Sequence, residues 1–430
     1  MTVSAESEIW SIGSVETVRA SDPSESRLLR ASFFYAGVAS LLPWQVLLTF
    51  THSFDCDVFL GSRFTGAGWP FWCSIVYSLA VNLTQLILTS RTVVARISFA
   101  LRWNVASVSQ ALSLMGLLLC HFYTTPESID TGFALAVACT ALLGAASGIM
   151  QACGFGLAGS LSPFFAQDLM FGQGVGGMLS GIVGLTLGKT KMGLMISFIS
   201  GSICLLLCIP MLLAMRTHPA VRPRTAVKPS GPQRELSSTS DGVASQSSSP
   251  MLTRGRSSGE ILVRNAWPQA LTVCIVFTIT FSIFPGVASG WQPGSRVPHV
   301  IAVFQMMDVV GRFAPQLSVL RVETGWIVSG MAVTRILFVP IFLAMQRLSS
   351  ETWETNGLLQ LGAMALMAFS NGYVSTLSMM LGPEQNGVSH QEKEPVGTIM
   401  SLSLVFGIFL GSSLALFTQI GMPNTNSCAQ

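Results

Sequence analysis

Asp308 and Arg312 are an acid and a base one helical turn apart within a stretch of mostly apolar residues. On a helix, side chains at positions i and i+4 share a face, so the carboxylate and the guanidinium can pair and offset each other's desolvation. An aspartate accepts hydrogen bonds from hydroxyl or ring N–H groups, and an arginine donates them from a rigid fork. Two interpretations follow, and both can hold: a neutralised packing pair, and part of a site for a polar ligand.

Three other residues inside apolar runs are candidates for the same site or its scaffold. Gln151 carries two donors and an acceptor, which suit either the edge of a heterocycle or a bond to a neighbouring helix. Trp44 falls in the middle of an apolar run rather than at its end, so its ring is expected to stack on a flat ligand or to pack in the core. Pro43 removes a backbone hydrogen bond and is expected to kink the helix.

Two charged residues are expected to serve a gate or the scaffold. Arg335 lies deep in an apolar run, where it would pair with helix-end carbonyls or with an acid on another helix. Asp168 lies at the start of another run, where a gate and a capping role fit equally well. The nine cysteines form no C-x-x-C pair and no His-Glu-x-x-His motif occurs. We therefore expect no metal, no cofactor and no enzymatic activity.

The elements that carry these residues are predicted to be membrane-spanning helices. Of the 430 residues, 50% are hydrophobic and only 10% are charged, whereas soluble proteins carry about a quarter charged residues. Apolar runs of about twenty residues match the ~30 Å hydrocarbon core of a bilayer. The sequence therefore predicts an all-α polytopic membrane protein with eleven transmembrane helices, at about 31–52, 69–90, 98–122, 132–158, 161–187, 191–215, 266–290, 297–320, 325–346, 357–382 and 395–420.

One long polar segment divides these helices into six and five. Residues 216–265 are rich in Ser, Pro and Arg and are expected to be disordered, because they cannot bury enough apolar surface to fold. With the N-terminus inside, the segments on the inner side of the membrane hold 15 Lys and Arg and those on the outer side five, which favours a cytoplasmic N-terminus and an extracellular C-terminus. The predicted organisation is a disordered cytoplasmic tail (1–30), a six-helix bundle (31–215), a cytoplasmic loop (216–265), a five-helix bundle (266–420) and a short extracellular tail (421–430).

Five motifs in order resemble those of the equilibrative nucleoside transporter family. The resemblance runs from about residue 31 to 420, apart from the 216–265 loop. The fourth- and fifth-helix pattern includes Gln151 and the Gly172-Gln-Gly174 step. The motifs are GVASLLPWQVLLTF (37–50), GIMQACGFGLAGSLSPFFAQDLMFGQGVGG (148–177), FQMMDVVGR (304–312), TRILFVPIF (334–342) and FSNGYVSTLSMMLGP (369–383).

The resemblance implies a major-facilitator-like fold whose two bundles rock around a midplane site to move nucleosides down their gradient, with nucleobases as an open alternative substrate. It implies that Trp44 contacts the nucleoside ring and Gln151 the base, and that Asp308 and Arg312 engage the ribose or the base. Leu41, Leu48 and Gln305 fall where family members line the cavity. Gln45 departs from the Asn common in relatives, which puts the geometry of a kink or gate there in doubt.

Several alternatives stay open at this point. Transport coupled to protons would use Asp308 as the carrier, and a receptor on the same fold would bind nucleoside without moving it. We expect a monomer in the plasma membrane, with lipid and a nucleoside or nucleobase as partners and no nucleic acid. The sequence does not fix the preference for purines or pyrimidines, the affinity, the membrane or the role of the 216–265 loop.

Overall fold

The computed structural model describes most of the predicted helices. The expected tails at 1–22 and 421–430, and most of the 216–265 loop, lie outside the described residues. Within the described ranges the chain forms helices and no strand. These ranges are 23–61, 68–187, 190–225, 258–261, 265–284, 297–348 and 353–419.

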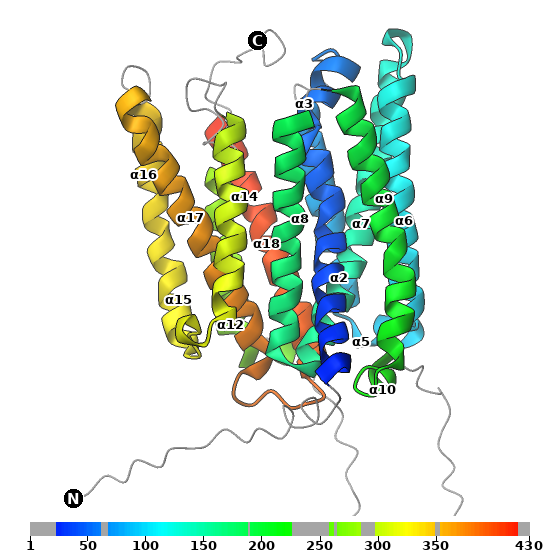
Figure 1. Cartoon of the computed structure of the whole chain (residues 1–430), viewed down its shortest axis with the longest axis vertical. Coiled ribbons are helices and arrows are strands. Elements are labelled where there is room, and N and C mark those ends of the chain that lie inside the picture. The colour runs from blue at the N-terminus through cyan, green and yellow to red at the C-terminus, as the bar shows by residue number, and fades with distance from the viewer. Residues whose placement is uncertain are drawn as a thin grey trace, which may run out of the picture.

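The first bundle contains six long helices, one at each range predicted before the loop. They alternate in direction, and short helices cap their ends: α3 (Thr51–Ser53) and η1 (Phe54–Val58) at one end, and α5 (Arg91–Arg96) and α10 (Arg222–Thr225) at the other. We call these the upper and lower ends, as drawn in Figure 1. The long helices are α2 (Pro23–Thr49), α4 (Trp69–Leu88), α6 (Phe99–Tyr123), α7 (Ile129–Leu161), α8 (Pro163–Leu187) and α9 (Lys191–Thr217).

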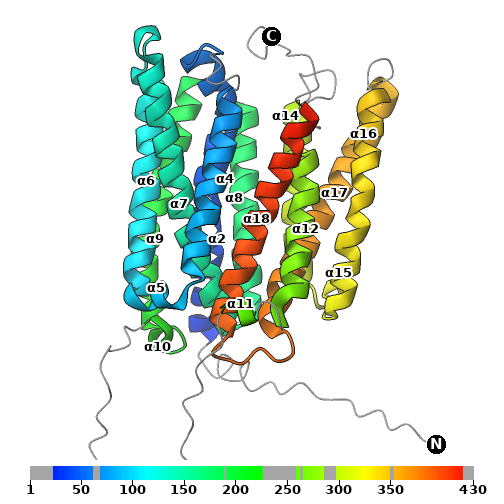
Figure 2. The ribbon, with the colours of Figure 1, turned by 180° about the vertical axis from the view of Figure 1, so that it is seen from behind.

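The second bundle follows the loop and packs beside the first. Figure 1 shows α14 next to α8, and Figure 2, from behind, shows α18 passing beside α4; both pairs are in contact. Its helices are α12 (Trp267–Ile283), α14 (Val297–Phe313), α15 (Gly325–Thr334), η7 (Arg335–Leu337), α16 (Phe338–Leu348), α17 (Trp353–Leu381) and α18 (Lys393–Gln419).

The all-helical membrane fold is confirmed, whereas the count of eleven membrane spans stays a prediction. Among the described residues, seven helical segments are long and apolar enough to cross a bilayer, and 72–88 and 267–283 form shorter apolar helices. Large apolar side chains on the outer faces, such as Leu112 and Leu213, are more than half exposed. Such a surface suits lipid as its solvent.

Three differences from the predicted helices are the largest, and two of them follow from proline. α2 begins at Pro23, so the last part of the expected tail is helical. α14 ends at Phe313 rather than near 320 because Pro315 cannot continue it, and two 3₁₀ turns follow. The span predicted at 325–346 is interrupted at η7, because Pro340 lacks the N–H that would bond the carbonyl of Ile336.

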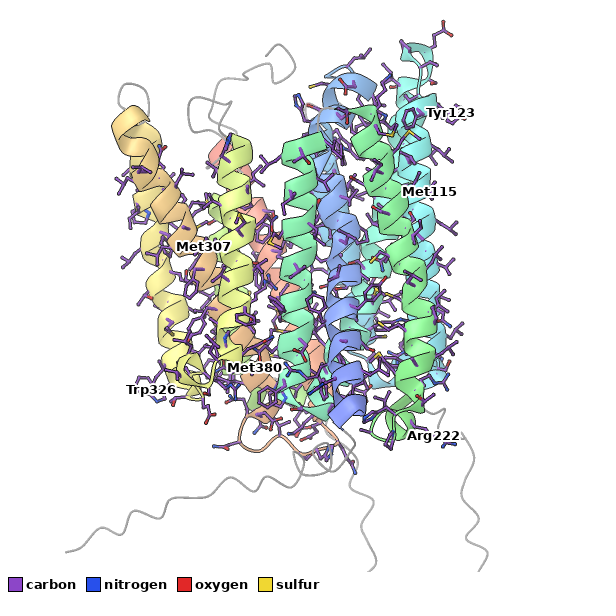
Figure 3. All side chains as sticks on the ribbon, viewed as in Figure 1. Met115, Tyr123, Arg222, Met307, Trp326 and Met380 are labelled. Atoms are coloured by element: carbon purple, nitrogen blue, oxygen red, sulfur yellow. The ribbon has the colours of Figure 1, made fainter. Side chains whose placement is uncertain are left out.

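The lower end is closed where the two bundles touch. The rings of Phe171 on α8 and Phe313 on α14 lie 5.5 Å apart, and the Arg321 guanidinium lies 4.6 Å from the centre of the Phe164 ring. On the opposite side α18 packs backbone to backbone on α7, where a Cβ at Gly397 would overlap the carbonyl of Phe155. In Figure 3, Arg222 marks this lower end and Tyr123 marks the upper end.

Candidate functional site

A cavity of about 390 Å³ lies between the two bundles. It is large enough for a small organic molecule, and its lining is mostly apolar with a few polar groups, as in typical ligand sites. It extends from the level of Asp308 and Arg312 to the upper end, where Thr51 and Pro70 line it. In Figure 3, Met307, next to Asp308 in the chain, lies near the middle of the bundle.

The structure brings most of the predicted site residues to this one cavity. Those that line it come from α2, α7 and α14, which are far apart in the sequence. They are Leu41, Trp44, Gln45, Leu48, Gln151, Gln305, Asp308 and Arg312. Pro43, Asp168 and Arg335 are not among the lining residues. Whether the lining residues bind a substrate stays a prediction.

Asp308 and Arg312 form a buried ion pair at the floor of the cavity. Arg312 Nε donates to Asp308 Oδ2 at 2.6 Å, and the two residues are 5% and 4% exposed. The second carboxylate oxygen, Oδ1, accepts from Asn371 Nδ2 at 2.7 Å. Arg312 Nη1 donates across to the Met170 carbonyl on α8 at 3.1 Å. Arg312 lines the cavity and within the described residues its Nη2 makes no hydrogen bond, so Nη2 is the donor left free for a ligand.

Close backbone packing of α14 on α17 places Asn371 beside Asp308. A Cβ added to Gly372 would overlap the carbonyl of Asp308, and one added to Gly311 would overlap the carbonyl of Phe369. Only glycine permits this approach, because any side chain would separate the two backbones. The short Asn371 side chain can therefore reach the carboxylate on the neighbouring helix.

Arg335 anchors the far side of the same polar chain. Asn371 Oδ1 accepts from Thr280 Oγ1 at 2.8 Å, and Thr280 Oγ1 accepts from Arg335 Nη2 at 2.6 Å. Arg335 Nη1 donates to the Met367 carbonyl at 3.0 Å and to Ser370. This residue is fully buried and helps to fix Asn371, so it acts on the cavity through other residues.

The opposite wall of the cavity is aromatic and uncharged. The rings of Trp44 and Tyr77 stack with centroids 4.0 Å apart and planes 14° apart. The Tyr77 hydroxyl and Gln151 Nε2 both donate to Ser147 Oγ, at 2.9 and 3.0 Å, and Ser147 Oγ donates to the Ser40 carbonyl at 3.1 Å. Gln151 lines the cavity and its Oε1 accepts no hydrogen bond from the described part of the chain, so this acceptor is left free for a ligand.

Three predicted residues join the bundles or brace one of them. Gln305 Nε2 on α14 donates to Gln45 Oε1 on α2 at 3.3 Å, so this amide contact spans the cavity between the bundles. Asp168 accepts two hydrogen bonds of 2.8 Å from Arg30 and ties α8 to the lower part of α2. That ion pair lies within the first bundle.

Tyr77, Ser147 and Asn371 were not singled out from the sequence. Asn371 carried the clearest signal, because it is an amide inside an apolar run, as Gln151 is. Tyr77 is one of only four tyrosines, but a tyrosine in an apolar helix is common in protein cores. Ser147 lies one turn before Gln151, but the sequence does not show that Tyr77 on another helix shares its hydroxyl as an acceptor.

The two walls of the cavity offer different chemistry. The wall of Trp44 and Gln151 presents a flat ring and a free carbonyl acceptor, which fit a heterocycle. The floor presents the free N–H groups of a guanidinium, which fit hydroxyl oxygens. A molecule with a flat ring at one end and hydroxyl groups at the other matches both.

Solved structures with a similar fold are membrane transporters. A bacterial homologue of the iron transporter ferroportin, in its outward-facing state with soaked iron, superimposes with a TM-score of 0.56 at 12% identity over 92% of this chain and 91% of that one. A transporter of the major facilitator superfamily in the outward conformation gives 0.52 at 13% identity over 94% and 93%. At these identities the likeness shows the fold alone, which is major-facilitator-like.

Sequence relatives define the family. Nucleoside transporter 1.2 of Leishmania donovani is 34% identical over 188 residues, 40% of this chain, so the chain spans 38% of that relative's length. Equilibrative nucleoside transporter 1 of Rattus norvegicus is 25% identical over 450 residues, which cover 90% of this chain and 96% of the relative. The family model described as "Nucleoside transporter" matches residues 137–420. Because this match covers more than half of the chain, the protein belongs to the nucleoside transporter family.

Proposed function

We propose that the protein moves nucleosides across the membrane down their concentration gradient, by alternate opening of its two bundles around the central cavity. The observation that carries this proposal is the pairing of a stacked aromatic wall with a guanidinium floor in one cavity between the bundles. Transporters of this architecture bind substrate near the bilayer midplane and rock one bundle against the other. No chemical step is needed, so the activity is transport rather than catalysis.

The cavity groups suggest how a nucleoside would be held. The base would lie against Trp44, with Gln151 Oε1 accepting from a ring N–H or an amino group. The ribose hydroxyls would accept from Nη2 of Arg312 and exchange hydrogen bonds with Gln305. Asp308 would act mainly by holding Arg312, since each of its oxygens already accepts a hydrogen bond. A nucleobase lacks the ribose and would use only the aromatic wall.

The conformation fits one stage of the transport cycle. The cavity reaches the upper end, and inter-bundle contacts close the lower end. With a cytoplasmic N-terminus, as the charge distribution favours, the cavity would face the outside of the cell. We extend the proposal to a monomer in the plasma membrane with its C-terminus outside.

Uptake by a host that lacks nucleoside transport tests the proposal. We expect the full chain to take up radiolabelled adenosine, inosine or uridine, with hypoxanthine as the test for nucleobases. Uptake should stop at equal concentrations on the two sides, because no energy source is coupled to it. No uptake of any of the four compounds, with the protein present in the plasma membrane, would refute transport.

Proton coupling through Asp308 is the alternative that the same assay decides. A proton on Asp308 would remove the negative charge that holds Arg312, so coupled transport would break the buried pair in every cycle. We therefore expect uptake to be unchanged by an uncoupler. Uptake that follows an imposed proton gradient would show that Asp308 or another group carries a proton.

Replacement of Trp44 should weaken substrate binding through loss of the aromatic wall. Trp44→Leu removes the ring that stacks on Tyr77, and aromatic stacking contributes about 0.5–1.5 kcal/mol beyond area burial. We expect the half-saturating nucleoside concentration to rise by up to about tenfold, since about 1.4 kcal/mol corresponds to a factor of ten. Trp44→Phe retains a stacking ring and should lose less. Equal half-saturation in both variants and the wild type would show that the base lies elsewhere.

A further inference from the structure

Four fully buried polar side chains near the bundle interface have no hydrogen-bond partner in the described part of the chain. Both amide atoms of Gln85 and of Gln167 are unpaired, and so are the hydroxyls of Thr376 and Ser401. Two belong to each bundle, and none of them lines the cavity. A buried polar group without a partner carries its full desolvation penalty, so this arrangement disfavours the conformation that contains it.

Gln85 and Ser401 lie just below the cavity where α4 meets α18. Asn82 on α4 donates to the Val405 carbonyl on α18 at 3.2 Å, and Val405 lines the cavity. The two helices run in opposite directions, so Gln85 lies one turn below Asn82, and Ser401 lies one turn below Val405. Both side chains are therefore placed on the facing sides of this interface, on the lower side of the cavity.

Gln167 and Thr376 occupy the matching level on the other side of the cavity floor. Gln167 precedes Met170 by about one turn, and the Met170 carbonyl accepts from Arg312. Thr376 follows Gly372 by one turn on α17, and Gly372 packs against Asp308. In Figure 3, Met380, one turn further along α17, lies near the lower end. Helix α8 contacts both α14 and α17, so the junction of these three helices, at whose level both residues lie, is part of the bundle interface.

Unpaired buried groups on α6 do not share this placement. Asn104 Oδ1 and Gln110 Oε1, for example, lie on α6, which packs against α7 and α9 of its own bundle. Rocking of one bundle against the other would leave such groups buried. It would, however, separate α4 from α18 and α8 from α17 at the lower end.

We propose that Gln85, Gln167, Thr376 and Ser401 line the lower half of the substrate path once the lower end opens, where they offer hydrogen bonds to a nucleoside in transit. We call them the lower polar set. This inference rests on the proposed transport function. The unpaired amides and hydroxyls raise the free energy of the lower-closed conformation, and opening relieves it by exposing them to water and substrate.

Cysteine accessibility tests the position of the set. Ser401→Cys and Thr376→Cys in the full chain are reconstituted in liposomes and treated with a membrane-impermeant methanethiosulfonate from the lower side. The control is Ser107→Cys on α6, whose parent residue is equally buried but bonded within its own bundle. We expect both test cysteines to label about tenfold faster than the control, because their labelling follows the population that is open at the lower end, whereas Ser107→Cys stays buried within its own bundle.

A matched pair of variants tests the energetic role. Thr376→Val removes the hydroxyl at nearly constant shape and so relieves the penalty in the lower-closed conformation, whereas Thr376→Ser retains the hydroxyl. We expect Thr376→Val to slow adenosine exchange by about tenfold and to raise the thermal midpoint of the detergent-solubilised protein. Thr376→Ser should exchange at the wild-type rate. A packing role alone would raise the midpoint without slowing exchange.

The outcomes separate this inference from the function on which it rests. If wild-type liposomes exchange adenosine but the test cysteines label at the Ser107→Cys rate, the proposed position of the lower polar set is refuted. The proposal of transport is then unaffected. Wild-type exchange combined with equal exchange rates in Thr376→Val and Thr376→Ser would refute its energetic role. Wild-type liposomes that exchange no nucleoside would refute both proposals.

Discussion

We expect Arg312→Ala and Asp308→Ala each to lower nucleoside uptake by at least tenfold, and by more than they lower the amount of protein in the membrane. Arg312 supplies the free donor at the cavity floor, and a hydrogen bond to a charged group contributes roughly 1.5–3 kcal/mol, or about tenfold or more in affinity. Loss of Asp308 leaves this guanidinium without its carboxylate, so its orientation is no longer fixed. Uptake per molecule of surface protein is the measurement.

A double variant separates ligand binding from structural pairing. Removal of one member of a buried ion pair destabilises a protein by roughly 3–5 kcal/mol, whereas removal of both charges is often tolerated. We therefore expect Asp308→Asn with Arg312→Gln to restore the surface level and thermal midpoint towards wild type. Uptake should remain low, because the guanidinium donor is absent. Recovery of uptake together with stability would assign the pair a packing role, and normal uptake by both single variants would place the site elsewhere.

Gly372→Ala should cause a large loss of stability and of uptake through a single added methyl group. The added Cβ would overlap the Asp308 carbonyl and lie 2.8 Å from the backbone nitrogen of Arg312. Helix α17 would therefore have to move away from α14. Overpacking of this kind costs about 1–3 kcal/mol. The movement would also withdraw Asn371 from Asp308, so we expect a lower thermal midpoint together with lower uptake per molecule.

Gly362 on the same helix provides the control. A Cβ there would meet no atom within 4 Å, so Gly362→Ala should leave uptake unchanged. Alanine can even stabilise this position by up to about 1 kcal/mol through helix propensity. If Gly372→Ala matched Gly362→Ala in thermal midpoint and uptake, backbone contact between α14 and α17 would not be what positions the site.

The energetics of membrane helices explain which residues of the candidate site could be predicted from the sequence alone. A polar side chain within a bilayer is costly, so Trp44, Gln151, Asp308 and Arg312 are conspicuous in apolar runs, and the structure brings all four to one cavity. The same rule gave Arg335 and Asp168 as candidates but could not separate them from the cavity residues. Other contacts offset the same desolvation cost away from the cavity. Arg335 bonds a helix carbonyl and a threonine, and Asp168 forms an ion pair within one bundle.

The sequence by itself determined a helical membrane protein, its family motifs and a short set of polar residues for its centre. Only the tertiary structure decided that Asn371 and Arg312 share the carboxylate of Asp308, that Tyr77 stacks on Trp44, and that the lower polar set is buried without a hydrogen-bond partner in the described part of the chain. The reason is distance along the chain. Helical periodicity fixes neighbours three or four residues apart, whereas these contacts depend on which helices pack together and how closely glycines such as Gly372 let their backbones approach.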